Sequence, residues 1–184
     1  MCPPDDRPVD LAAYIETLER PFWEPIGRYV FRFGMLEQKV DEALSLLMGI
    51  DFFQTGQFVL RPIDFGDRAN LLRAYSRGRD ARLHTEMEKV VKDIVKQTEF
   101  RNTLVHGPWM AYIGNYKDGE RAAQKVGLTG RHKFKATNIT PTEILANSTK
   151  VNDLITKVTR ISQSVAALRS AHVEPPPIAD EPEK

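Results

Sequence analysis

The chain has 184 residues, 41% of them hydrophobic and 28% charged, with a formal net charge of +1. This composition is typical of a globular protein and excludes the strongly basic class of dedicated nucleic-acid binders. The single cysteine, Cys2, leaves no internal disulfide and fits a reducing cytoplasm. Because the N-terminus lacks a signal-peptide pattern and no apolar run is long enough to span a membrane, we expect a cytoplasmic protein without a membrane partner.

Charge is distributed unevenly along the chain. Residues 1–10 carry a net charge of −2 and residues 173–184 carry −3, so a total of +1 leaves +6 for residues 11–172. This positive body is compatible with a polyanionic partner. We predict a flexible N-terminal arm over 1–10, one helical domain over 11–172 and a disordered, acidic, proline-rich tail over 173–184.

Apolar residues spaced three or four apart predict helices in the first half of the chain. Asp10 is a candidate cap for a short helix over 11–19, which Pro21 is expected to close. A long helix is expected from about 25 to 50. Residues 51–63, which contain a glycine and a proline, are expected to form a loop.

Two further helices precede residue 107. One begins at Asp64 or Asp67 and extends to about Arg77, and the central helix extends from about Arg82 to His106. The apolar face of this central helix is predicted to contain Leu83, Met87, Val90, Val91, Ile94 and Val105.

The pattern changes after Pro108. Aromatic residues followed by Asp118-Gly119 predict a β-hairpin-like insertion over about 109–140. A last helix then starts at Thr140-Pro141 and ends near His172, with apolar residues every seven positions. The sequence therefore predicts an all-α protein, a four-to-five-helix bundle with a small β-hairpin-like insertion before the last helix.

Three polar side chains stand out at the end of the central helix. Arg101 falls near the centre of the apolar face, while Asn102 and His106 lie four residues apart on its shoulder. A guanidinium on a buried face is costly unless a partner meets it. On an ideal helix Arg101 and His106 point about 140° apart.

This Arg-Asn-x-x-x-His pattern, placed before Gly107-Pro108 at the end of a bundle helix, resembles the HEPN superfamily (higher eukaryotes and prokaryotes nucleotide-binding domains). The resemblance implies a four-to-five-helix bundle, often a two-fold dimer, and a metal-independent endoribonuclease of a defence or toxin–antitoxin system. Some toxin members carry tyrosine two residues after the histidine, where this chain has Pro108. The insertion over 109–140 has no counterpart in the minimal HEPN fold.

The resemblance implies catalytic roles for Arg101, Asn102 and His106, with no cofactor and no metal. Histidine transfers protons near neutral pH, and His106 lies in the last helical turn, where helix carbonyls favour the imidazolium form. Arginine offers planar charged donors that match phosphate oxygens. Asn102 is a candidate to orient the histidine or to bind the ribose. The implied product is a 2′,3′-cyclic phosphate, formed at a composite site in a homodimer.

Other interpretations stay open. Arg101 could pair with Glu37 or Asp41, while Asn102 and His106 cap the helix, and such a protein could be a non-catalytic module that binds a nucleotide, RNA or a protein partner. Further candidate partners are RNA, a second copy of the chain, and an antitoxin or regulatory protein. Four basic residues outside the motif are candidate RNA contacts, although solvated faces explain them equally well: Arg73, Arg77, Arg131 and Lys133.

Overall fold

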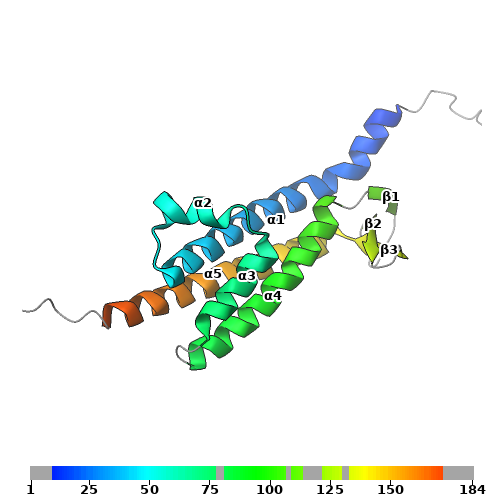
Figure 1. The fold of residues 1–184 in the computed structure, drawn as a ribbon. Coiled ribbons are helices and arrows are strands. Elements are labelled where there is room, and N and C mark those ends of the chain that lie inside the picture. The colour runs from blue at the N-terminus through cyan, green and yellow to red at the C-terminus, as the bar shows by residue number, and fades with distance from the viewer. Residues whose placement is uncertain (1–9, 78–80, 107–108, 114–121, 130–132, 172–184) are drawn as a thin grey trace, which may run out of the picture. The chain divides into compact units, whose positions relative to one another are not determined.

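A computed structural model describes residues 10–77, 81–106, 109–113, 122–129 and 133–171 of the protein. In this part of the chain the fold is all-α in class, with five α-helices and one small antiparallel sheet before the last helix (Figure 1). The predicted fold class is thereby confirmed. The predicted arm over 1–10, apart from its last residue, and the predicted tail over 173–184 lie outside the described residues.

The first helix, α1 (Leu11–Met48), is longer than the sequence predicts. Asp10 caps it, because its Oδ1 accepts hydrogen bonds from the Ala12 and Ala13 amides at 3.0 and 3.2 Å. The prediction that Pro21 closes a short helix is wrong, since Pro21 and Pro25 both lie inside α1. A proline removes one backbone donor and kinks a helix without necessarily ending it, and Figure 1 shows the bend in the N-terminal part of α1.

The segment after α1 is helical, which corrects the loop predicted over 51–63. Gly49, at φ 77°, ends α1 in the left-handed conformation that glycine adopts readily. A single π-helical turn, η1 (Phe52–Gly56), and the short helix α2 (Gln57–Leu60) follow. Asp51 caps η1 by accepting a hydrogen bond from the Gln54 amide. Gly56 is therefore the last residue of η1, and Pro62 follows the end of α2 by two residues.

Three more helices match their predicted positions: α3 (Phe65–Ser76), α4 (Ala81–His106) and α5 (Pro141–Ala171). The Asp64 carboxylate caps α3 through the Gly66 amide. Thr140 caps α5, because its hydroxyl accepts a hydrogen bond from the Glu143 amide at 3.1 Å. Pro141 occupies the first helical position, where its missing amide hydrogen costs nothing.

The predicted insertion is a three-stranded antiparallel sheet, one strand more than a hairpin. Strands β1 (Trp109–Ile113), β2 (Ala122–Thr129) and β3 (Lys133–Ile139) follow in this order across the sheet. The segment predicted as the return of the hairpin contains two strands, and the second of them, β3, pairs with β2 from Ala123–Ile139 to Thr129–Lys133. The predicted turn at Asp118-Gly119 lies outside the described residues.

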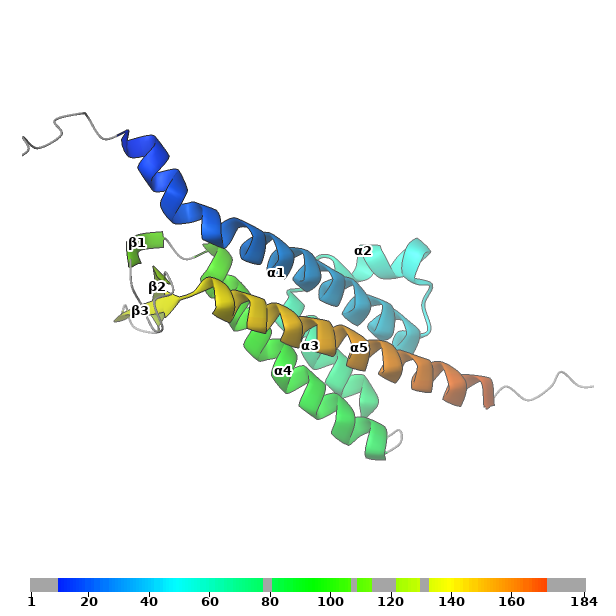
Figure 2. The same cartoon turned by 180° about the vertical axis from the view of Figure 1, so that it is seen from behind.

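The chain divides into two compact units. The first unit contains residues up to Glu37 together with Lys92–Ile155, and the second contains Gln38–Val91 together with residues from Thr156 onward. Within the first unit, the segments of α1, α4 and α5 lie side by side, with the sheet near the end of α4 and the start of α5 (Figures 1 and 2).

The predicted apolar face of α4 is correct except at its end. Val105 is 43% exposed, whereas Leu104 is buried at 2%. The buried face therefore passes through Gln97, Arg101 and Leu104, at steps of four and three residues. On α5, the seven-residue repeat predicts the buried residues correctly: Ile144, Val151, Leu154, Val158, Ile161 and Val165.

A mostly buried ion pair joins α1 and α3 in the second unit. Arg68 Nη1 lies 2.5 Å from Asp41 Oδ2. Burial raises the pKa of Asp41, and the Arg68 guanidinium opposes part of this shift. A raised pKa means that folding favours the protonated Asp41 carboxyl. The stability gained from this protonation is complete below the ordinary pKa of 3.8, and it is lost as the pH rises through the pKa of Asp41 in the folded protein.

We expect Arg68→Met alone to lower the free energy of unfolding by about 3 kcal/mol at neutral pH, because it leaves the Asp41 carboxylate buried without its partner. The double variant Asp41→Leu, Arg68→Met should be at least as stable as the wild type, since it removes both charges. Urea unfolding followed by circular dichroism measures both. A single variant as stable as the wild type would contradict the burial of this pair.

Candidate functional site

The last two turns of α4 bring Arg101, Asn102 and His106 together at the surface of the first unit. Arg101 Nη1 lies 2.8 Å from His106 Nε2 and 3.2 Å from Asn102 Oδ1. Arg101 is half-buried, whereas Asn102 and His106 are exposed. The 140° between the Cβ directions of an ideal helix does not keep Arg101 and His106 apart, because the long arginine side chain extends toward the C-terminal end of α4 and reaches the imidazole.

The direction of the Arg101–His106 hydrogen bond follows from chemistry. A guanidinium has donors and no acceptor, so His106 Nε2 must accept and its proton must be on Nδ1. The same Arg101 nitrogen also donates to the Asn102 side-chain oxygen. One planar cation, one imidazole lone pair and one amide therefore share a small exposed area, a combination suited to a phosphodiester.

An aromatic platform holds the arginine. The Arg101 guanidinium carbon lies 6.0 Å from the centre of the Phe33 ring on α1. The Tyr29 ring packs against Phe33 at 6.1 Å and, edge-on, against Phe100 at 5.2 Å. Burial raises the pKa of Tyr29, and the positive charge of Arg101 opposes part of the shift. Arg101 is thus supported from α1 and α4 together.

A buried polar network, which the sequence analysis did not predict, begins at the Tyr29 hydroxyl. The Tyr29 hydroxyl donates to the Gln97 carbonyl at 2.9 Å, and Gln97 Nε2 donates to Asn147 Oδ1 at 3.2 Å. Asn147 Nδ2 in turn donates to the Glu143 carbonyl at 2.9 Å. The sequence did carry a signal, since Gln97 and Asn147 are polar residues at apolar positions of α4 and α5. The network fixes α4 one turn before Arg101.

The sequence analysis left open that Arg101 pairs with an acid on the first helix and that Asn102 and His106 cap the end of α4. Asp41 pairs with Arg68 in the second unit, so it is not the partner of Arg101. The Asn102 side-chain oxygen accepts a hydrogen bond from Arg101. The prediction that α4 ends at His106 is confirmed, whereas Gly107 and Pro108 lie outside the described residues.

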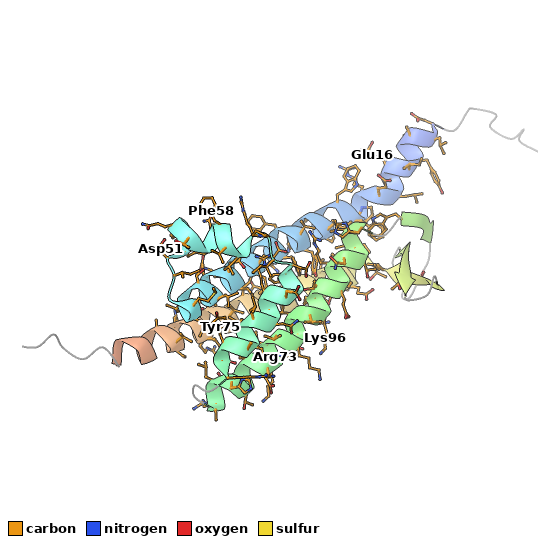
Figure 3. All side chains as sticks on the ribbon, viewed as in Figure 1. Glu16, Asp51, Phe58, Arg73, Tyr75 and Lys96 are labelled. Atoms are coloured by element: carbon orange, nitrogen blue, oxygen red, sulfur yellow. The ribbon has the colours of Figure 1, made fainter. Side chains whose placement is uncertain are left out.

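Of the four candidate RNA contacts outside the motif, two have described side chains and two do not. Arg73 and Arg77 belong to the second unit, where Arg73, labelled in Figure 3, donates to Asn70 Oδ1. Lys133 begins β3, but its side chain is outside the described part. Arg131 is entirely outside it.

A second histidine, His84, lies beside a serine hydroxyl. Ser76 Oγ lies 2.8 Å from His84 Nδ1, and His84 Nε2 lies 3.7 Å from Glu88 Oε1. This is not a nucleophile, because Ser76 is buried and donates its proton to the Arg73 carbonyl. Over residues 10–77, 81–106 and the described strands and last helix, no group of three or more His, Cys, Asp or Glu side chains is placed to hold a metal.

No helix among the described residues is by itself long and apolar enough to cross a membrane. Helix α1 and the segment Phe52–Leu60 meet the length and composition criteria as a pair, with a bend of 112° between them. Comparison with models of known protein families found no match for this chain, and searches of curated proteins and of solved structures found none either. The assignment of function therefore depends on the site at the end of α4.

Proposed function

We propose that this protein is a metal-independent endoribonuclease of a defence or toxin–antitoxin type, with Arg101, Asn102 and His106 as its catalytic residues. The observation that carries the proposal is the 2.8 Å contact between the Arg101 guanidinium and the exposed His106 imidazole. Phosphodiester transesterification requires a fixed positive charge beside a group that transfers protons at neutral pH. These two side chains supply both.

In the proposed reaction, RNA itself provides the nucleophile. The ribose 2′-hydroxyl loses its proton and its oxygen attacks the adjacent phosphorus, while the bond from phosphorus to the 5′-oxygen breaks and that oxygen takes up a proton. The products are a 2′,3′-cyclic phosphate and a free 5′-hydroxyl. His106 transfers protons, Arg101 binds the phosphate oxygens on which negative charge develops, and Asn102 orients the imidazole or the ribose.

A homodimer completes the proton transfers. The attack needs a base and the departure of the 5′-oxygen needs an acid, and one His106 cannot be in both protonation states at once. Two copies of the chain, related by a two-fold axis, would supply one histidine for each role. The composite site proposed here therefore follows from the two proton transfers and not from the direction in which the side chains point.

The test is RNA cleavage in excess chelator. Wild-type protein is expected to cut single-stranded and structured RNA into fragments that end in 2′,3′-cyclic phosphate, which mass spectrometry identifies by the missing water relative to a linear phosphate. Fragments that end in 3′-hydroxyl, or cleavage that stops when divalent ions are chelated, would refute the mechanism.

A non-catalytic module that binds a nucleotide, RNA or a protein partner is the second candidate. The aromatic platform favours it, because a guanidinium supported by Phe33 can bind a phosphate without any proton transfer. RNA or nucleotide binding that weakens in Arg101→Ala, without cleavage by the wild type, would establish this alternative.

A further inference from the structure

The segment of α1 before Pro21 extends beyond the end of α4 and the start of α5 in the first unit (Figures 1 and 2). Four apolar residues of this segment, which we call the N-terminal stripe, follow the spacing of one helix face: Leu11, Tyr14, Ile15 and Leu18. They lie on the same side of α1 as Phe22 and Tyr29, which are buried. The core-facing side of α1 therefore continues past the core.

Most of the N-terminal stripe is uncovered in the described part of the chain. Leu11, Tyr14 and Ile15 are 65%, 55% and 41% exposed, and Leu18 is half-buried. Together these side chains expose on the order of 300 Å², a size at which an apolar patch is often functional. Anchors at positions i, i+3, i+4 and i+7 are the pattern by which an amphipathic helix binds in the groove of another protein.

The N-terminal stripe is on a preformed helix. Asp10 caps its first turn by accepting hydrogen bonds from the Ala12 and Ala13 amides at 3.0 and 3.2 Å. The helix then continues through Pro21 into the body of the unit, where the Phe22 and Trp109 rings lie 5.8 Å apart. A partner that binds this helix therefore has little ordering entropy to overcome.

Charge indicates which kind of partner fits. Residues 1–19 carry five acids and one base, a net charge of −4, so the total of +1 leaves +5 for the rest of the chain. Glu16, labelled in Figure 3, is exposed on this segment. Carboxylates here repel RNA and an anionic membrane surface. They also disfavour a second copy of the same segment, because like charges would meet.

We propose that the N-terminal stripe is a docking helix for a different protein, one that has an apolar groove with basic residues along its rim. The four apolar side chains fill the groove, while Asp10 and Glu16 attract the rim. The exposed area is well below the roughly 800 Å² per partner of a standard stable complex, so the contact is transient, with a dissociation constant on the order of micromolar. This contact is independent of the proposed nuclease activity.

The test starts with a photoreactive benzoylphenylalanine in place of Tyr14, in the full chain and in the cells that produce it. Illumination is expected to join the chain covalently to another protein, which mass spectrometry identifies. The same probe in place of Tyr75, which is 40% exposed on α3, should not give this product. The identified protein, purified on its own, is then titrated with the wild-type chain, and we expect micromolar binding that weakens as salt rises.

Variants of the N-terminal stripe test the contact directly. Leu11→Glu combined with Ile15→Glu should weaken the binding by roughly 30-fold or more, because both anchors are lost. Thermal unfolding should not change, since these side chains are exposed. Glu16→Lys should weaken the binding less and reduce its salt dependence. Phe58→Glu, at a side chain 78% exposed on α2, is the matched control and should bind like the wild type.

The other outcomes are equally definite. A covalent product absent at position 14, a product made of two copies of this chain, or full affinity in the double variant overturns the docking helix. Binding that salt does not weaken removes the basic rim and overturns the proposed partner. RNA cleavage without this contact leaves the nuclease standing, and partner binding without RNA cleavage leaves the docking helix standing.

Discussion

Replacing His106 with alanine should lower the rate of RNA cleavage by roughly 10²–10⁴-fold, because the variant has no group to exchange protons with the 2′- and 5′-oxygens. The fold should be unaffected, since His106 is exposed in the last turn of α4. Single-turnover cleavage of a labelled RNA measures the rate. Circular dichroism and thermal unfolding of the variant show whether the helices are intact.

His106→Gln separates proton transfer from positioning. Glutamine offers an oxygen that can still accept a hydrogen bond from Arg101, but it does not titrate near neutral pH. We expect it to be as inactive as His106→Ala. If His106→Gln kept most of the wild-type rate, the imidazole would be a positioning group and the assigned chemistry would be wrong.

Arg101→Lys should lower the cleavage rate by roughly 10²–10³-fold, although it keeps the positive charge, because the ammonium lacks the planar donors that match two phosphate oxygens. It also loses the stacking of the guanidinium 6.0 Å from the Phe33 ring centre. The loss should appear mainly in the maximal single-turnover rate, with a smaller effect on RNA affinity, because charge on the phosphate increases in the transition state.

Arg82→Ala is the matched control for Arg101→Lys. The Arg82 side chain is 88% exposed on the first turn of the same helix and lies 3.5 Å from Glu86. Its removal should leave the rate within the error of measurement. Equal losses in both variants would mean that the effect of Arg101→Lys does not come from the place of the guanidinium beside His106.

The sequence predicts the starts of three α-helices well, because a side chain caps the backbone at each of them. Asp10, Asp64 and Thr140 each satisfy free amides at the start of a helix, a local interaction that a short stretch of sequence encodes. The prolines of α1 gave a wrong boundary, because whether Pro21 ends or only kinks a helix depends on the packing on either side of it. Phe22, buried and 5.8 Å from Trp109, is part of that packing.

The candidate site was predictable in its residues but not in its geometry. Arg101, Asn102 and His106 stand out as polar residues at one end of an apolar helix. A helical wheel shows where Cβ atoms point, and a side chain as long as arginine can reach far from that direction. The wheel also cannot show that Phe33 lies under the guanidinium, since α1 and α4 are far apart in sequence.

The hydrogen bond from Arg101 to His106 has a consequence for the resting protein. In the proposed nuclease, the imidazole lone pair that takes a proton from the ribose already accepts a hydrogen bond from Arg101, so the base would be blocked until substrate binds. A phosphate that draws the guanidinium toward its own oxygens releases that lone pair in the same movement. Substrate binding and activation of the base would then be one event. We therefore expect a reagent that modifies imidazoles to react with His106 faster when an uncleavable phosphate analogue is bound than when the protein is free.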